Sequence, residues 1–386
     1  MTRTQSETQR LKRALAAVLA VCMAFALASC GTKADSSPSG APTQSDPGAA
    51  QPSTATGGEG VAEPSTEPAK ELFKLRAFDP AVDFLELSIA DELGFFADEG
   101  LEIEYVGAQP QGVSAFQLLE EGEIDIVYSG HPPSIGQARL AGLDVVAVAP
   151  GMVDGDWGPH VNYLVREDSP LQSLDDLKPG LKIAIAGIAP CTDGYLRYWA
   201  VQHGWDPEGI EWVTMAGSGQ MEQAVLDGSI DVTTSHTPNS KIALSKGGYR
   251  SLGTTWDIFQ SPAAGLAVRT VHQSLIDEHP EAVQGFVNAM YRARKWANAN
   301  REQAENLVSA VFGLNPGDVL ANPEDENKNI DPAYLDLWWE ISETIGLWEP
   351  GAIAPEDTYT NQFVPRDIPE SDLTLTWDGT VKHVFH

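Results

Sequence analysis

Cysteine, basic side chains and long apolar runs are all scarce in this sequence of 386 residues. Of its three cysteines, Cys22 and Cys30 lie near the start, so Cys191 has no partner for a disulfide in the rest of the chain. Lysine and arginine number 24 against 55 acids, for a formal net charge of −31. That balance excludes nucleic acid as a partner, because phosphate binding requires a positive surface. After residue 30, no apolar run is long enough to span a bilayer.

Motifs for several activities are also missing. No glycine-rich loop ends in Lys-Ser or Lys-Thr, so ATP hydrolysis is not expected in this chain. There is no cysteine-rich iron motif, the histidines show no metal-ligand spacing, and no Ser-His-Asp arrangement has support in the sequence. We therefore expect no cofactor, no metal and no enzymatic activity.

The first thirty residues have the layout of a secretory signal. Arg3, Arg10 and nearby basic residues precede an apolar run that reaches Leu27-Ala28-Ser29-Cys30. A basic start, an apolar middle and small residues before a cleavage site are typical of a signal peptide, here residues 1–29. The cysteine at that site resembles a bacterial lipobox, which implies that Cys30 carries lipid and anchors an extracytoplasmic protein to the cell membrane. The alternatives are an ordinary cleaved signal or a short anchor.

A low-complexity segment follows the predicted lipidation site. Residues 30–71 are mostly Ser, Thr, Pro, Gly, Ala, Gln and acids, with almost no large apolar side chain. Such a segment cannot bury enough apolar surface to offset its conformational entropy. We expect a flexible linker between the membrane and a globular body.

The body alternates between strand and helix patterns, which predicts an α/β fold with mostly parallel sheets. Expected strands are 74–78, 101–106, 124–128, 144–148, 182–186, 211–213 and 230–233, and expected helices between them are 85–93, 115–119, 134–140, 192–201 and 220–226. The alternation restarts after residues 168–170, so two lobes of similar plan are expected. Helices are expected at 280–300 and 332–345, and the tail from 372 to 386 has a short, strand-like pattern.

The two lobes contain an internal repeat. Residues 122–134 align without gaps on residues 228–240, and six of the thirteen positions are identical: Gly, Ile, Asp, Ser, Pro and Ser. In both copies a helix ends at glycine, a strand follows, and a loop with serine leads to the next helix. The alternative is chance similarity between two helix–strand units. Related lobes would face each other across a cleft, with equivalent loops on its two walls.

Several motifs in this order resemble one family of solute-binding proteins. Residues 89–104, IADELGFFADEGLEIE, are similar to the run A-x-x-x-G-(F/Y)-F-x-x-x-G-L-x-(V/I)-E found in binding proteins for nitrate, sulfonates, taurine and thiamine-pyrimidine precursors. LLEEGEIDI at 118–126, LDDLKPGLKIA at 174–184 and HPEAV at 279–283 resemble further motifs of that NMT1/THI5-like family. The resemblance spans roughly residues 74 to 350.

The resemblance implies a type II periplasmic-binding-protein fold, with two α/β lobes and a helical C-terminal segment. Lobe 1 would comprise residues 72–162, lobe 2 residues 163–264, and residues 265–386 would return to lobe 1 and form the last helices. The chain would cross between lobes near 161–165 and 265–268. Ligand would bind in the cleft, the lobes would close about a hinge, and the closed form would dock on an ABC permease whose ATPase is another chain.

Ligands of open α/β sheets bind beyond the C-terminal ends of strands, at the starts of helices. Four such loops and three aromatic side chains supply the candidate ligand-binding residues, namely Asp79, Asp83, Phe84, Ser129, Gly130, His131, Trp157, Cys191, Thr192, Ser235, His236, Asn239 and Trp256. His160, beside the predicted hinge, is a further candidate for the cleft wall. The alternatives are helix capping for the hydroxyl residues and core packing for Phe84 and the two tryptophans. For Cys191, we prefer the role of a small buried residue.

The charge of these loops bears on the ligand. Free amides and hydroxyls at helix starts suit an anion, because the helix dipole is positive there. None of the four loops contains Arg or Lys, however, and Asp79 and Asp83 add negative charge to the first. This composition also suits a neutral or zwitterionic solute, such as taurine or a pyrimidine, whose amine or ring N–H can pair with an acid.

The expected function is an extracytoplasmic solute-binding lipoprotein of an ABC importer. Its partners would be a small sulfonate, taurine, nitrate or pyrimidine-like solute, the permease with its ATPase, and the membrane through the lipid on Cys30. Two alternatives stay open: an enzyme on the same fold that makes a pyrimidine or menaquinone precursor, and a lipid-tethered ligand sensor.

Overall fold

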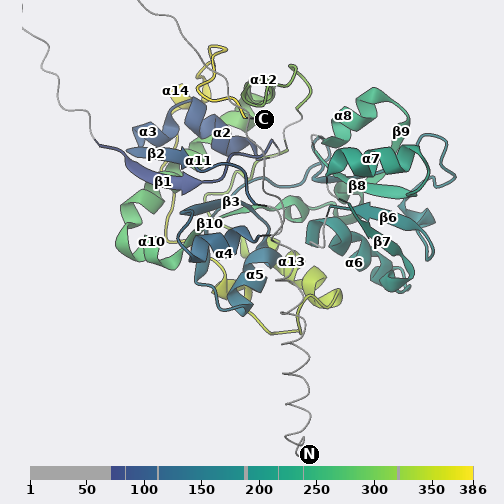
Figure 1. The fold of residues 1–386 in the computed structure, drawn as a ribbon. Helices are drawn as coiled ribbons and strands as arrows, with labels where there is room; N and C mark the ends of the chain where they lie inside the picture. Colours follow the sequence, from purple (N-terminus) through teal and green to yellow (C-terminus); the bar gives the residue numbers. More distant parts are fainter. Residues whose placement is uncertain are drawn as a thin grey trace, which may run out of the picture. The chain divides into compact units, whose positions relative to one another are not determined.

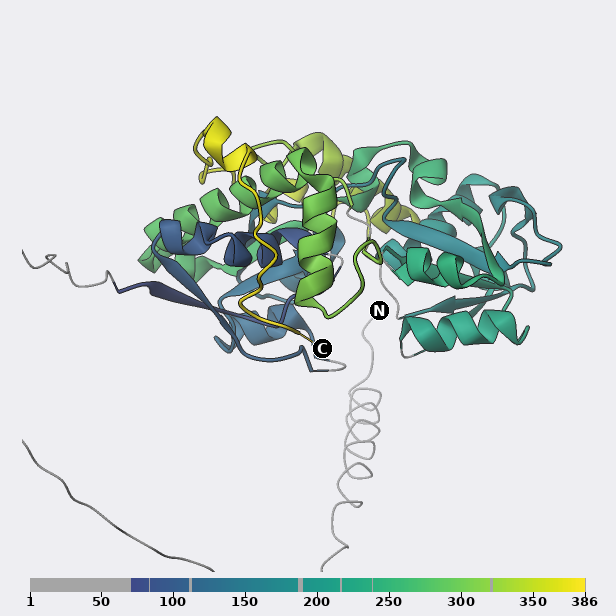
Figure 2. The same ribbon diagram turned by 90° about the horizontal axis from the view of Figure 1, so that it is seen from above.

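The computed structural model describes residues 71–82, 84–110, 113–186, 190–215, 217–237, 239–319 and 322–385 (Figure 1 and, from above, Figure 2). These residues belong to one compact unit, Thr66–His386. The predicted signal, Cys30, nearly all of the predicted linker and the candidate Asp83 lie outside the described residues. Of the helices described, none has both the length and the apolar composition that crossing a membrane requires.

The first lobe is built on two small sheets. Its elements are β1 (Phe73–Ala77), α2 (Leu85–Glu92), α3 (Phe95–Asp98), β2 (Leu101–Tyr105), α4 (Ala115–Glu120), β3 (Ile126–Gly130), α5 (Pro132–Leu140), β4 (Val145–Pro150) and, much later in the chain, β10 (Val268–His272). Strands β1 and β2 pair in parallel. β10 lies between β3 and β4 and runs antiparallel to both.

The second lobe has one five-stranded sheet in the order β7-β6-β8-β5-β9. Its elements are β5 (Val161–Arg166), η1 (Leu174–Asp176), β6 (Lys182–Ile185), η2 (Pro190–Gly194), α6 (Tyr195–Gln202), η3 (Pro207–Gly209), β7 (Glu211–Thr214), α7 (Ser218–Leu226), β8 (Val232–His236), α8 (Asn239–Lys246), β9 (Tyr249–Thr254), α9 (Thr255–Phe259) and η4 (Pro262–Gly265). β6 is parallel to β7 and β8, and β5 is antiparallel to β8 and β9.

The expected α/β fold of two lobes is confirmed. Three of the strand pairings are parallel and four are antiparallel, and the antiparallel pairings have one explanation. Only β5 among the strands of the second sheet, and only β10 among those of the β3-β10-β4 sheet, runs against its neighbours. β5 is the first strand of the second sheet, and β10 is the strand with which the chain returns to the first lobe. Each strand reached through a crossing is therefore the one that is reversed.

Helices dominate after β10. They are α10 (Gln273–Glu278), α11 (Pro280–Ala299), α12 (Arg301–Val311), α13 (Pro332–Thr344), η5 (Pro355–Asp357) and α14 (Glu370–Leu373). The two expected helices at 280–300 and 332–345 are confirmed as α11 and α13. α13 contacts α5 of the first lobe as well as α6, η2 and η4, so it supports the region where the lobes meet.

The hydrophobic core continues from the first lobe into the second. One cluster lies within the first lobe and packs α2 and α11 together through residues such as Leu87 and Phe286. A second cluster joins Phe116 of the first lobe, Tyr195 of the second and Trp338 of α13. Because Trp338 is fully buried among side chains from both lobes, the junction between the lobes is a packed apolar layer.

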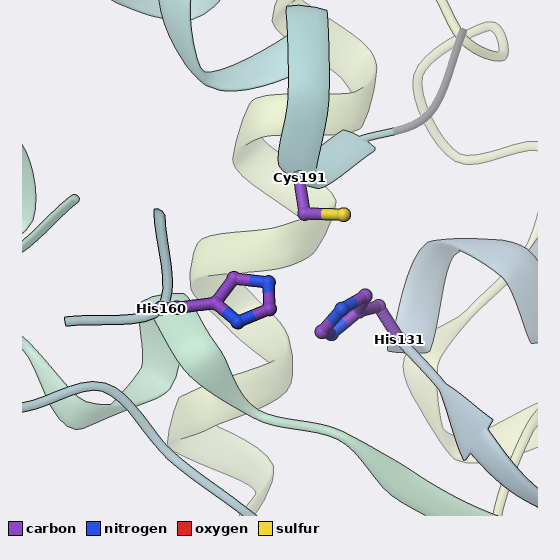
Figure 3. A group of neighbouring side chains, drawn as sticks. All are labelled: His131, His160 and Cys191. Carbon is purple, nitrogen blue, oxygen red and sulfur yellow. The ribbon is translucent and has the colours of Figure 1, made fainter. Parts of the chain in front are cut away.

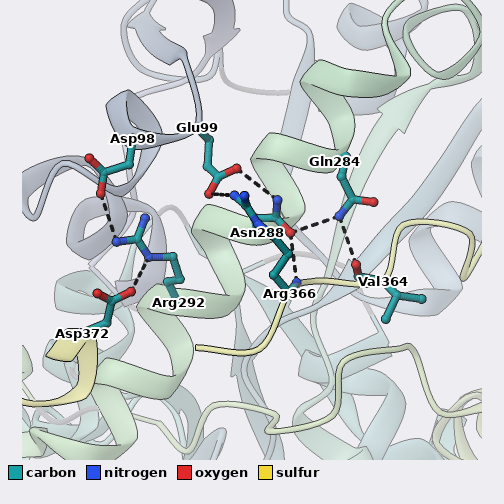
Figure 4. Close-up of polar contacts among 8 residues, drawn as sticks. All are labelled: Asp98, Glu99, Gln284, Asn288, Arg292, Val364, Arg366 and Asp372. Carbon is teal, nitrogen blue, oxygen red and sulfur yellow. Dashed lines mark hydrogen bonds and ion pairs between the residues drawn. The ribbon is translucent and has the colours of Figure 1, made fainter. Parts of the chain in front are cut away.

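Residues after α13 are held on the first lobe by polar contacts with α11 (Figure 4). The guanidinium of Arg292 contacts Asp98 of α3 at 3.0 Å and Asp372 of α14 at 2.8 Å. The amide of Asn288 donates to Glu99 at 3.0 Å and accepts from the backbone N–H of Arg366 at 3.2 Å. α11 therefore fixes α3 on one side and the C-terminal segment on the other.

The expectation of a strand-like tail is wrong for the residues described. Residues 374–385 form no strand, and α14 (Glu370–Leu373) covers the first two residues of the predicted tail. The alternation of Leu375 and Trp377 with polar residues resembles a strand, but the chain turns at Gly379, where φ is +89°, and the indole N–H of Trp377 donates to the carbonyl of Thr380 at 2.6 Å. No neighbouring strand pairs with this segment among the described residues.

The internal repeat seen in the sequence is present in the structure as matched hydrogen bonds. Asp125 accepts from the backbone N–H of Arg76 at 2.8 Å, and its own N–H donates to the carbonyl of Arg76 at 2.9 Å. Asp231 makes the same two bonds with Lys182, at 2.8 and 2.9 Å. Both pairs are 49 residues apart in the chain. The repeated aspartate thus joins the strand it precedes to an earlier strand of its lobe.

Replacing Asp125 by alanine should destabilise the protein more than replacing Asp231 by alanine. Asp125 also accepts two bonds from the side chain of Arg76, at 2.9 and 2.7 Å, a pairing that Asp231 lacks among the described contacts. We expect Asp125→Ala to lower the free energy of unfolding by about 2 kcal/mol and Asp231→Ala by about 1 kcal/mol, since bonds to charged groups are the stronger ones. Urea unfolding of both variants measures the difference, and equal losses would contradict it.

Candidate functional site

Three histidines from different parts of the chain lie in a row where the lobes meet. His131 precedes α5 of the first lobe, His160 precedes the crossing strand β5, and His236 ends β8 of the second lobe. The ring centroids of His131 and His160 are 4.8 Å apart, and those of His160 and His236 are 4.9 Å apart, with both pairs edge to face. The row therefore reaches from one lobe to the other through the crossing segment.

The repeat explains why two of these histidines lie opposite each other. Gly130 aligns with His236, and His131 aligns with Thr237, so the two imidazoles occupy neighbouring positions of equivalent loops. Each loop leaves the end of a strand, β3 in one lobe and β8 in the other. The two walls of the site are thus built from the same local structure.

A thiol completes the cluster. Cys191 lies in η2, a π-helical turn at the start of α6, and is buried. One donor atom from each of His131, His160 and Cys191 lies within 4.8 Å of the other two. Figure 3 shows the three side chains directed toward a common point.

The ring orientations are fixed by neighbouring groups. Nδ1 of His131 is 2.8 Å from the carbonyl oxygen of Leu266, in the second crossing. The ring of His131 also stacks on Trp338, with centroids 5.2 Å apart, and the indole N–H of Trp338 donates to the carbonyl of Ala263 at 2.8 Å. On the other side, the carboxylate of Asp154 accepts from the backbone N–H of His160 at 2.8 Å. The crossing segments therefore position the ring of His131 and the backbone of His160.

Burial controls the protonation of the cluster. It lowers the pKa of His131 to about 4 and that of His236 to about 4, and it lowers the pKa of His160 well below the ordinary value. Burial also raises the pKa of Asp154 to about 6. At neutral pH the three imidazoles are uncharged, so each has one nitrogen lone pair available.

The arginine near the start of α6 is engaged elsewhere. Nε of Arg197 lies 2.6 Å from Asp193, and the same guanidinium also pairs with Glu208. Its planar face lies over the ring of Trp212. The site therefore offers neutral imidazoles and hydroxyls, as the composition of the four loops predicted, in place of a guanidinium aimed at a ligand.

Several predicted site residues lie in or next to the cluster. His131, Cys191 and His236 are members of it or adjoin it, and Thr192 follows Cys191 in η2. Ser235 precedes His236 on β8 and is buried, and its hydroxyl finds no hydrogen-bond partner among the described residues. The other three are Ser129 and Gly130, which end β3 just before His131, and Asn239, which begins α8.

Other predicted residues have surroundings of their own. Phe84 is buried in the core of the first lobe, edge to face with Tyr128. This arrangement matches the alternative of core packing for Phe84. Trp157 is 39% exposed and carries the guanidinium of Arg301 over its ring, 3.9 Å from the centroid. Asp79 lines a first-lobe cavity of about 260 Å³ together with Ser129. Trp256 is partly buried in α9.

Reasoning from the sequence missed the supporting side chains. Trp338 has the same helical spacing as its packing neighbours in α13, so nothing marks it as the residue beneath His131. Asp154 lies in an irregular stretch rich in glycine, and only its acidity could have drawn attention to it. The histidines and Cys191 are far apart in the chain, which is why their spacing carried no metal-site signal.

Comparisons with known proteins identify a family and several relatives of similar sequence. A sequence-family model described as "NMT1/THI5 like" matches residues 81–304. The nitrate import ATP-binding protein NrtC of Synechococcus elongatus is 27% identical over 277 residues, which are 67% of this chain but only 37% of NrtC. This chain therefore corresponds to well under half of that relative.

Solved structures share the fold. The periplasmic aliphatic sulphonate binding protein SsuA of Escherichia coli superposes with a TM-score of 0.59 at 20% identity, covering 78% of this chain and 97% of SsuA. The desulfurization enzyme DSZB superposes with a TM-score of 0.53 at 17% identity, covering 75% of this chain and 97% of DSZB. At these identities the likeness establishes the fold alone.

Proposed function

Because this chain belongs to the NMT1/THI5-like family, we propose that it is the solute-binding component of an ABC importer. The fold is the expected type II periplasmic-binding-protein fold. The observation that carries the proposal is the row of His131, His160 and His236, which draws on the first lobe, the crossing and the second lobe. A solute held there touches all three parts at once, so its binding favours the closed arrangement of the lobes.

The proposed solute is small and carries hydrogen-bond acceptors, as sulfonates, taurine, nitrate and pyrimidines do. SsuA is named for aliphatic sulphonates and NrtC for nitrate import. In this chain, neutral imidazoles and the hydroxyls of Thr192 and Ser235 would provide the contacts. Ligand-binding roles for the other predicted residues, Asp79, Asp83, Phe84, Ser129, Gly130, Trp157, Cys191, Asn239 and Trp256, belong to the same proposal.

The proposed setting is the outer face of a membrane. Residues 1–29 would direct export, a lipid on Cys30 would anchor the chain, and the segment up to residue 71 would let the body reach its permease. The ATPase would be a separate chain, since no phosphate-binding loop occurs in this sequence. Solute would be delivered when the closed form docks on the permease and reopens.

One observation favours a second candidate, an enzyme on the same fold. A buried thiol beside two imidazoles is also the composition of a nucleophilic site, and DSZB is named as a desulfurization enzyme. The two candidates separate in one assay. A binding protein returns the solute unchanged, whereas an enzyme releases a product that mass spectrometry detects.

A thermal-shift panel tests the transport proposal. We expect one of nitrate, taurine, alkyl sulfonates, aryl sulfonates or hydroxymethylpyrimidine to raise the melting temperature, because a ligand at 100 times its Kd stabilises the folded state by about 2.7 kcal/mol. X-ray scattering with the same ligand should then show a smaller radius of gyration. A panel without any shift, or a shift without closure, would contradict the proposal.

Thr192→Ala locates the ligand within the site. The hydroxyl of Thr192 lies 3.4 Å from the carboxylate of Asp193, in the turn that also holds Cys191. Removing it should weaken solute binding about 2- to 10-fold by calorimetry, since one hydrogen bond contributes about 0.5–1.5 kcal/mol. Thr380→Ala, in the tail, is the control and should leave the affinity unchanged. Unaltered affinity in Thr192→Ala would remove η2 from the site.

A further inference from the structure

We propose that His131, His160 and Cys191 form a binding site for one Zn²⁺ ion, and that this ion takes the anionic group of the solute at its open position. The second half of the proposal rests on the transport function, whereas the first half stands without it. Two imidazoles and one thiolate are ligands that Zn²⁺ prefers, and three protein ligands with one free position are a common zinc arrangement.

Three separate segments deliver the donors, so their meeting is a product of the fold. His131 comes from the loop before α5, His160 from the loop before β5 and Cys191 from η2. Their donor atoms lie within 4.8 Å of one another. Bonds of about 2.0–2.1 Å to nitrogen and 2.3 Å to sulfur place the donors of a tetrahedral site roughly 3.5 Å apart. The atoms would therefore move together by about 1 Å when the ion binds.

The tautomer of His131 suits coordination. A carbonyl oxygen can only accept, so Nδ1 of His131 carries the hydrogen that is donated to Leu266 at 2.8 Å. In the neutral ring this leaves the lone pair on Nε2. A ligand histidine with its other nitrogen bonded to a backbone carbonyl is the usual arrangement around zinc, because the second bond fixes the ring and its tautomer.

His160 supplies an independent observation. Its Nε2 is buried and has no hydrogen-bond partner among the described residues. A buried polar atom without a partner costs about 1–3 kcal/mol, so such atoms in native proteins require an explanation. A metal ion at the point toward which all three side chains are directed provides the missing contact (Figure 3).

The ion would supply a charge that the loops lack. Arg197 is paired with Asp193 and Glu208, and the four candidate loops contain no Arg or Lys. Zn²⁺ with one thiolate has a net charge of +1, since the thiol proton passes to solvent on binding. That charge at the lobe junction would attract a sulfonate, carboxylate or nitrate group.

Cobalt spectroscopy on the full chain in metal-free buffer tests the site. We expect one Co²⁺ per chain, with a thiolate-to-cobalt charge-transfer band that Zn²⁺ abolishes by displacement. Cys191→Ser and His131→Gln should lose the band and bind Zn²⁺ more than about 100-fold more weakly, because losing an outer partner alone costs about 10–100-fold. His383→Asn, an exposed histidine of the tail, is the matched control and should keep both. Retention of the band by Cys191→Ser would overturn the site.

X-ray absorption of the zinc-loaded, unaltered chain gives a readout that needs no variant. One sulfur near 2.3 Å and two nitrogens near 2.0–2.1 Å are expected, whereas a shell of oxygen alone would assign the ion to surface acids and overturn the proposal.

The solute panel, repeated with Zn²⁺ and with chelator, tests the role of the ion in solute binding separately from the metal site. Equal solute affinity with Zn²⁺ and with chelator would show that the ion does not bind the solute. If no solute binds although the zinc shell is as expected, the transport function fails and the metal site stands.

Discussion

Replacing Glu86 by glutamine should lower the free energy of unfolding by about 3–5 kcal/mol, the range found when one partner of a buried ion pair is removed. Glu86 and Arg269 are in contact, and their side chains are 1% and 0% exposed. Arg269 also donates to the carbonyl of Tyr128. Without the carboxylate of Glu86, the fully buried guanidinium stays in the core with less of its charge compensated.

The cluster around this pair explains why it lies where it does. Arg294 of α11 donates to the carbonyl of Pro150, and the N–H of Asp325 donates to the carbonyl of Gly151 at 2.8 Å. Glu324 faces Met152 in an isolated antiparallel bridge. The buried charges therefore hold the end of β4, where the chain leaves the first lobe for the crossing.

Glu324 provides an internal comparison for the Glu86 variant. Burial raises the pKa of Glu324 from 4.5 to about 7, and neither of its oxygens has a hydrogen-bond partner among the described residues. The folded state thus keeps a proton that the unfolded state releases, so the contribution of Glu324 to stability should slope downward as the pH rises from about 4.5 through about 7. The buried histidines, whose pKa values are lowered, contribute the opposite slope, so the Glu324 contribution is measured as the difference between the unaltered chain and Glu324→Gln. Glu324→Gln should flatten this slope and cost far less than Glu86→Gln at pH 8.

Urea unfolding at pH 5.5 and pH 8 measures both effects. The control is Glu211→Gln, which removes an exposed partner of Lys182 at 3.4 Å, with the two side chains 60% and 48% exposed. Such surface pairs contribute about 0–1 kcal/mol. A loss in Glu86→Gln no larger than in Glu211→Gln would show that the buried pair adds nothing to stability.

The fold could be predicted well where the local sequence pattern and the neighbours of a segment in the structure favour the same element. The repeated Gly-x-Ile-Asp marked both a helix end and a strand start, and Asp125 and Asp231 make matching bonds. β5 belongs to the five-stranded sheet, and β10 lies between β3 and β4 in the sheet of the first lobe. The tail was misjudged because alternation predicts a strand only if another strand is free to pair with it.

The site was predictable only in part. His131 and His236 follow strand ends, a position that local pattern identifies. Their contact with His160 and Cys191 depends on how the crossing segments and η2 fold against α13, which no local pattern encodes. Arg269 and Arg294 were equally hidden, because an arginine within a strand or a helix gives no sign in the sequence that it is fully buried.

Gly265→Ala should lower the free energy of unfolding by about 3 kcal/mol or more, since overpacking typically costs 1–3 kcal/mol even where side chains can yield. Gly265 ends η4, just before the chain returns to the first lobe. A Cβ there would lie 2.3 Å from the backbone nitrogen of Asp154 and 2.5 Å from the carbonyl carbon of Val153. The clash is with backbone, so no rotamer change relieves it.

The same substitution should also impair the site, which separates it from an ordinary core mutation. The two crossings are joined by a 3.0 Å bond from the N–H of Asp154 to the carbonyl of Pro262, and they carry the groups that fix His160 and His131. Forcing the two crossings apart should move both rings.

The matched control is Gly219→Ala in α7, where a Cβ meets nothing within 4 Å and alanine should be neutral or stabilise by about 0.5–1 kcal/mol. Urea unfolding and solute calorimetry on both variants measure the two effects. A Gly265→Ala protein with normal stability and affinity would mean that the crossings can separate without disturbing the histidines, and the site would then need another support.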